Sequence, residues 1–118
     1  MKKLRIAVPT ESHAGLTDVV SEVFGKAKTF TIIDIEDGNI ENIEVIENPA
    51  ASYEYGAGPV AVKTLADLQV DLVVAGQLGP GALNLLKHHK ISRSSVESGT
   101  KVADCIEEVL SKTKAKGV

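Results

Sequence analysis

Residues 70–82 read VDLVVAGQLGPGA, and this stretch decides the fold class. The apolar run Val70–Ala75 shows little alternation, which predicts a strand that is buried on both faces of a sheet. The glycine turn Gly76–Gly81 follows at once and opens a helix predicted over Pro80–His88. A helix start leaves backbone N–H groups without partners inside the helix, and the helix dipole adds positive potential there. The turn is therefore a candidate site for an anion or a small charged ligand.

The first half of the chain predicts three strands. Leu4–Val8 ends at Pro9, Thr29–Ile35 is rich in β-branched residues, and Ile40–Glu47 alternates apolar and acidic residues. The turn Glu36–Asn39 contains Asp-Gly, which favours a tight hairpin between the second and third strands. Residues 10–27 are irregular, with one short helical turn expected around residues 18–22.

The second half predicts two further helices and a short strand. A helix is expected from Pro59 to about Gln69, a weak strand over Ile91–Val96, and a last helix after Thr100. The order βββαβαβα indicates a three-layer α/β fold, with a mixed five-stranded sheet and helices on both faces. We expect one domain over residues 1–118, with a frayed tail at residues 112–118.

Composition limits the function classes. The chain has 118 residues and a net charge of −3, and only 3% of its residues are aromatic, so nucleic acid is not an expected partner. No apolar run approaches the roughly 18 residues of a membrane span. We found no signal-peptide core, so a cytoplasmic location is expected. The single cysteine, Cys105, excludes a disulfide within the chain.

Three loops are expected at the carboxyl edge of the sheet, where ligands of open α/β sheets bind. These are residues 9–24, 48–59 and 76–81, and each contains glycine. Gly56 and Gly58 precede one helix, and Gly76, Gly79 and Gly81 precede the next. The two turns can form one anion-binding cleft. Alternatively, the glycines serve only tight turns and close packing of helix on sheet.

The residues capable of metal or nucleophilic chemistry are few. His13, in the first loop, can ligate a metal, contact an anion or remain a loop residue without a ligand. His88 and His89 are expected at a solvated helix end, and Cys105 lies on the apolar stripe of the last helix. No serine-nucleophile motif, P-loop or convincing set of metal ligands occurs, so metal ligands stay unassigned. We therefore expect a binding protein with no catalytic residues.

Seven stretches together resemble the dinitrogenase iron–molybdenum cofactor biosynthesis family. In order and spacing they cover roughly residues 4–111. They are Ile6–Thr10 (IAVPT), Val20–Ala27 (VSEVFGKA), Asp34–Gly38 (DIEDG), Glu47–Pro49 (ENP), Gly56–Pro59 (GAGP), Gly76–Leu83 (GQLGPGAL) and Ser98–Thr100 (SGT).

The resemblance implies a ribonuclease H-like fold and a protein that carries or inserts the iron–molybdenum cofactor or an iron–sulfur precursor. Family members often carry His before the Phe-Gly of the first loop and near the Gly-Ala-Gly segment. This chain has Val23 at the first position and Tyr53 and Tyr55 near the second. Nuclease chemistry needs clustered carboxylates for metal ions, and the first strand has no acid, so that activity is excluded.

Three functions follow. The first is a carrier or chaperone of a metallocluster that delivers it to a cofactor-accepting protein. The second is a regulatory module for a small anion or nucleotide, and the third is a homo-oligomer paired through Ile40–Glu47. For cofactor binding, the candidate residues are His13, Phe24, Gly25, Gly56, Gly58, Gly76, Gly79 and Gly81.

Overall fold

The computed structural model describes residues 3–116 and the side chains of residues 3–112. The order of strands and α-helices is the predicted one, and the helix Pro80–His88 has the predicted bounds. The elements are β1 (Lys3–Thr10), η1 (Gly15–Thr17), β2 (Thr29–Glu36), β3 (Asn39–Glu47), α1 (Ala57–Asp67), β4 (Leu72–Ala75), α2 (Pro80–His88), β5 (Ser92–Ser95) and α3 (Val102–Lys116).

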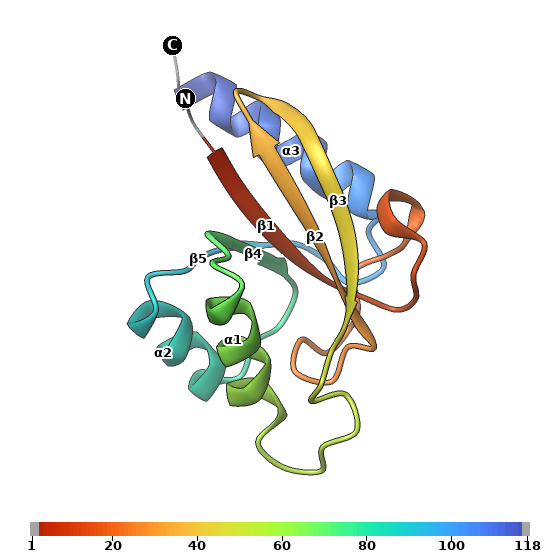
Figure 1. Ribbon diagram of the computed structural model, residues 1–118, viewed down its shortest axis with the longest axis vertical. Coiled ribbons are helices and arrows are strands. Elements are labelled where there is room, and N and C mark those ends of the chain that lie inside the picture. Colours follow the sequence, from red (N-terminus) through yellow and green to blue (C-terminus); the bar gives the residue numbers. More distant parts are fainter. Residues whose placement is uncertain (1–2, 117–118) are drawn as a thin grey trace.

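The five strands form one mixed sheet in the order β3-β2-β1-β4-β5. β1 is antiparallel to β2 and parallel to β4, and β4 is parallel to β5. Helices α1 and α2 cover one face of the sheet and α3 covers the other (Figure 1). This arrangement confirms the three-layer α/β prediction.

Each face of the sheet has its own core, because alternate strand residues point to opposite faces. Ala7, Phe30 and Val73 face α1 and α2, where they pack with Leu65 and Leu86. On the other face, the core under α3 consists of Ile6, Val8, Val20, Ile33, Ile35, Val74, Val102, Cys105, Ile106 and Val109. Cys105 is thus a core residue, as its place on the apolar stripe predicted.

Some local predictions differ from the structure. β1 continues through Pro9 to Thr10, and α1 begins at Ala57 instead of Pro59. The helical turn of the first loop is η1 at Gly15–Thr17, not residues 18–22, because Val19 and Val20 form β-bridges with Lys101 and Thr10. The last helix continues to Lys116, so residues 112–116 of the expected frayed tail are helical. Residues 117 and 118 lie outside the described residues.

β3 is an edge strand, and most of it is exposed. Asp34 pairs with Asn42 and Ile35 pairs with Ile40, so Glu41 is an extra residue in a bulge. The bulge interrupts the predicted alternation and turns Ile40 to the same face as Ile43. Each of these two isoleucines is 39% exposed.

The start of β1 and the end of α3 lie together at one end of the molecule (Figure 1). The loop between β3 and α1 lies at the opposite end, beside the start of α1. β1, β4 and β5 are parallel, and their carboxyl ends point away from the end of the molecule at which β1 begins and α3 ends.

Candidate functional site

A cleft of about 370 Å³ lies at the carboxyl edge of the sheet, between the first loop and the starts of α1 and α2. The first loop contributes Phe24 and Gly25, α1 contributes Gly58, and the turn before α2 together with its first residues contributes Gly79 and Gly81. Five of the eight residues predicted for cofactor binding therefore share one cleft. Its volume is in the range of small-ligand sites.

The absence of a side chain at Gly25 allows the first loop to touch the start of α1. A Cβ atom at Gly25 would lie 2.8 Å from the Gly58 nitrogen and 3.0 Å from its Cα. A Cβ atom at Gly58 would lie 3.6 Å from the Ala82 side chain of α2. These glycines permit close packing of backbone segments, as the alternative interpretation of the sequence proposed. The same packing builds one wall of the cleft.

Gly76 lies in an adjoining hollow of about 500 Å³ that Arg93 and Glu22 also line. The Arg93 guanidinium donates from Nη2 to the Gly76 carbonyl oxygen at 2.7 Å. A Cβ atom at Gly76 would lie 3.3 Å from the Val96 carbonyl oxygen. The glycine turn is therefore held against β5 and packs closely against the residues that follow β5.

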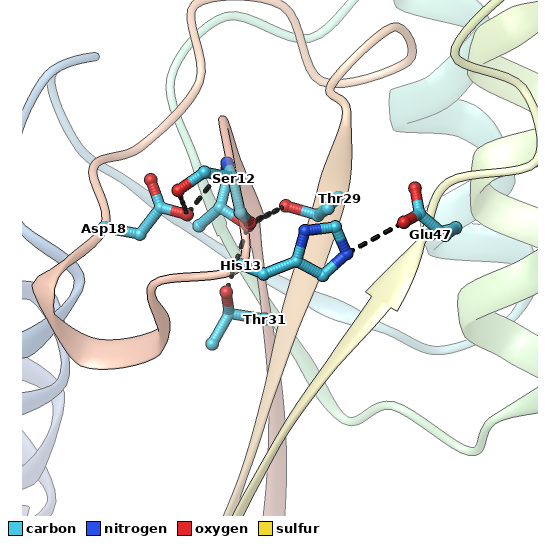
Figure 2. Close-up of polar contacts among 7 residues, drawn as sticks. Ser12, His13, Asp18, Thr29, Thr31 and Glu47 are labelled. Atoms are coloured by element: carbon cyan, nitrogen blue, oxygen red, sulfur yellow. Dashed lines mark hydrogen bonds and ion pairs between the residues drawn. The ribbon is translucent and has the colours of Figure 1, made fainter.

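The other two predicted residues, His13 and Gly56, do not line the cleft. The His13 side chain points to Glu47 at the end of β3, with Nε2 2.8 Å from the Glu47 carboxylate (Figure 2). Gly56 is the residue before α1, in the left-handed region with φ of 74°. It connects the exposed loop to the helix whose start lines the cleft.

Buried hydroxyl groups hold the first loop to the sheet (Figure 2). Thr29 Oγ1 donates to the Ser12 carbonyl oxygen at 2.6 Å. A hydroxyl has one proton, so Thr29 accepts from Thr10 at 2.6 Å. Thr10 then accepts from Thr31 at 3.0 Å. The chain of hydrogen bonds runs in one direction and fixes where the loop leaves β1.

Asp18 closes the same loop from the other side. Its Oδ2 accepts from the Ser12 amide at 2.9 Å and from Ser12 Oγ at 3.0 Å, and its Oδ1 accepts from the Val19 amide at 2.8 Å. Burial alone would raise the pKa of Asp18, but the hydrogen bonds from Val19, Ser12 and Glu11 outweigh it and lower the pKa below its ordinary value. The carboxylate is therefore held in its charged form.

Asn48 joins the two loops that flank the cleft. Its buried Nδ2 donates to the carbonyl oxygens of Gly25 and Ala27, each at 2.9 Å. Its Oδ1 accepts from the Ala50 amide at 3.0 Å. One side chain thus fixes the Phe24–Ala27 turn against the chain that leaves β3.

Sequence reasoning missed the polar residues that line these hollows. Lys26, Glu54 and Gln77 line the cleft, and Arg93 lines the adjoining hollow. They come from separate loops and from β5, and no spacing in the sequence connects them. Glu54 and Gln77 lie in two of the three loops predicted at the carboxyl edge, and Lys26 lies just after the first of them, in the irregular stretch 10–27. No other signal in the sequence marks them.

The lining of the cleft offers backbone groups and charge, without soft metal ligands. Among the described residues, those that line it include no Cys or His. In the part of the chain that the structure describes, His, Cys, Asp and Glu form no group of three that could hold a metal ion. A metallocluster that relies on protein thiolates or imidazoles does not fit this donor set. The charged side chains that line the cleft are those of Lys26 and Glu54.

The histidines at the end of α2 form no part of the cleft lining. The rings of His88 and His89 contact each other edge to face, with centroids 5.2 Å apart, and both residues are exposed. The arrangement agrees with a solvated helix end.

A larger hollow of about 600 Å³ at the opposite edge contains Arg5, Asp34 and Asp71. Arg5 Nε lies 2.7 Å from the Asp34 carboxylate, and Nη1 donates to the Leu68 carbonyl oxygen at 2.7 Å. Its backbone amide donates to Asp71. Hydrogen bonding to Asp34 raises the pKa of Arg5. These contacts join the chain between α1 and β4 to Arg5 of β1, and they account for both aspartates as structural residues.

Residues 2–112 match the dinitrogenase iron–molybdenum cofactor family. The chain belongs to this family. Three relatives extend the comparison. An uncharacterized protein of Methanocaldococcus jannaschii is 29% identical over 107 residues, which are 91% of this chain and 86% of that protein.

Two solved structures share the fold along almost the whole chain. The apo form of the orange protein from Desulfovibrio gigas is 28% identical with a TM-score of 0.83, over 92% of this chain and 88% of that one. A Thermotoga protein, proposed to be NifB, is 31% identical with a TM-score of 0.71, over 92% of this chain and 88% of its own. The family is thus linked to the iron–molybdenum cofactor. Within residues 3–116, none of the helices is long and apolar enough to cross a bilayer.

Proposed function

We propose that this chain is a non-catalytic carrier for an anionic metallocluster of the iron–molybdenum or iron–sulfur type, delivered to a cofactor-accepting protein. The observation that carries the proposal is the cleft, in which Phe24, Gly25, Gly58, Gly79 and Gly81 meet in a member of this family. The starts of α1 and α2 border it, and the helix dipoles favour an anion there. Lys26 adds a positive side chain.

The donor set defines how the cargo is held. Hydrogen bonds and charge would hold the cluster, which arrives with its own ligands complete. Such a site releases its cargo without breaking a metal–ligand bond, as a carrier requires. No chemical step on the cargo is needed.

Anaerobic gel filtration tests the proposal. The purified chain is incubated with iron–molybdenum cofactor extracted from dinitrogenase, or with a thiolate-capped four-iron four-sulfur cluster, and iron and molybdenum are measured in the protein peak. We expect metal to be retained, and Lys26→Gln to reduce the retention. Lys63→Gln is the control, because it removes the same charge from the exposed face of α1. A protein peak without metal contradicts the proposal.

The same cleft supports a second proposal, a regulatory site for a small anion or nucleotide. Arg93 and Lys26 lie on either side of the glycine turn 76–79, in adjoining hollows. A ligand present well above its Kd should raise the melting temperature by an amount equivalent to a few kcal/mol. A flat melting temperature with phosphate, nucleotides and carboxylates excludes this function.

The exposed edge of β3 supports a third proposal, self-association through Ile40–Glu47. Ile40 and Ile43 form an apolar strip on one face of this edge, whereas Glu41, Glu44 and Glu47 would repel a second copy. Association should therefore increase with salt, which screens the carboxylates. Sedimentation equilibrium at low and high salt measures it, and a monomer mass at every concentration and salt level excludes it.

A further inference from the structure

The segment Ser52–Gly56 lies in the loop between β3 and α1 (Figure 1). All five of its residues are exposed, two of them are tyrosines, and Glu54 lines the cleft. The half-buried Ala51 and the buried Ala50 precede it, and the buried Ala57 follows it. Tyr55 is 85% exposed and Tyr53 is 42% exposed. By contrast, both phenylalanines of the chain are buried, and the chain has no Trp. Large exposed rings of this kind, in the described chain, are thus confined to this segment.

The carboxylate of the segment lies at the cleft, whereas its two tyrosine rings do not. Glu54 lines the cleft, and among the described residues that line it there is neither Tyr53 nor Tyr55. An anionic cargo in the cleft would be repelled by the Glu54 carboxylate. The Glu54 side chain must therefore leave the cleft when an anionic cargo binds.

Gly56 provides a joint at which the segment can turn. Its φ is 74°, a conformation that other L residues rarely adopt, and nothing lies within 4 Å of the position of a Cβ atom. The other end of the segment follows Asn48, whose side chain is fixed by three hydrogen bonds. The segment itself is held by the hydrogen bond from the Tyr53 amide to the Ala50 carbonyl oxygen, at 3.0 Å. Movement of the segment opens this bond and leaves the three hydrogen bonds of Asn48 in place.

We infer that Ser52–Gly56 is a cover for the cleft, which turns at Gly56 so that Glu54 leaves the cleft and the tyrosine rings close over the cargo. The inference rests on the proposed carrier function, because that function supplies the anion. Tyr53 and Tyr55 are suited to this contact, since each has an apolar ring to exclude water and a hydroxyl to donate to an anionic cluster.

Limited proteolysis with chymotrypsin tests the cover. The enzyme cleaves after aromatic residues. Because both phenylalanines are buried, we expect it to cut the folded chain after Tyr53 and Tyr55. Bound thiolate-capped four-iron four-sulfur cluster should slow this cleavage several-fold. Trypsin cleavage at the exposed Lys90, in the turn after α2, is the control and should keep its rate.

Removal of the acid gives a second measurement. Glu54→Gln should tighten binding of the same cluster by roughly two- to fivefold, the size expected for one charge at a partly exposed site. Glu41→Gln changes the net charge equally at the opposite edge and should leave binding unchanged. If the cluster is retained but the tyrosines are cleaved as fast as before, the cover is wrong and the carrier function stands. If no cluster is retained, both fail.

Discussion

At the scale of single residues, Asp18 shows how one carboxylate can order a loop. Replacing it with Asn puts an N–H₂ group opposite donors from Ser12 or Val19. Asp18→Asn should therefore lower the free energy of unfolding by about 1.5–3 kcal/mol at neutral pH. Urea denaturation measures the change. Asp67→Asn, at an exposed pair on α1, should cost less than about 1 kcal/mol.

The pH dependence of this effect follows from the direction of the pKa shift. Folding lowers the pKa of Asp18 below its ordinary value of 3.8. The stabilisation is thus present above pH 3.8 and is lost as the pH falls through the lower pKa of the folded state. The difference between wild type and Asp18→Asn should shrink over that range. A difference that stays constant down to the acid transition contradicts the assignment.

Asn48 is the second residue whose side chain decides local order. Asn48→Asp keeps the shape but removes both donors to Gly25 and Ala27, leaving carbonyl oxygens against a carboxylate. We expect a loss of about 2–4 kcal/mol in the free energy of unfolding. Asn84→Asp, on the exposed side of α2, adds the same charge and should change it by less than about 0.5 kcal/mol. Equal effects of the two substitutions would refute a specific role for Asn48.

At the scale of elements, the contact between the first loop and α1 depends on Gly25. Gly25→Ala forces a Cβ atom into the backbone of Gly58, so the two segments must separate. The expected cost is about 1–3 kcal/mol. Gly81→Ala meets nothing within 4 Å and lies in α2, so it should stabilise the chain by up to about 1 kcal/mol. In thermal denaturation, the melting temperature should fall for Gly25→Ala and rise for Gly81→Ala.

The elements themselves were largely predictable because they depend on local signals. Pro80 at a helix start and the apolar spacing of Ala82 and Leu86 predicted α2 to the residue. The bulge at Glu41 was not predictable, because it depends on the register with β2. The position of η1 also escaped prediction, since the bridges of Val19 and Val20 join distant parts of the chain.

The candidate site was only partly predictable, for the same reason. Glycine turns predicted which loops reach the carboxyl edge, and five of the predicted residues meet in the cleft. The pairing of His13 with Glu47 depends on β3 lying beside the first loop. The positions of Lys26, Glu54 and Arg93 depend on three segments that only the fold brings together.

At the scale of the whole molecule, Cys105 reports on global unfolding. Burial, together with Glu108 and Asp104, raises the pKa of its thiol to about 11. The thiol is therefore protonated and enclosed under α3 at neutral pH. Labelling with a disulfide reagent at pH 8 should be on the order of a thousandfold slower in native buffer than in urea. Rapid labelling of the native chain would show that α3 opens independently of the rest.

The placement of the chain ends has a consequence for how this fold can be combined with others. β1 begins and α3 ends at the same end of the molecule, far from the loop that borders the cleft (Figure 1). A domain whose ends lie close together can be fused at either end, or inserted into a surface loop of another protein, without rearrangement. The fold is thus suited to be a module within a larger polypeptide, with its cleft at the end remote from the junction.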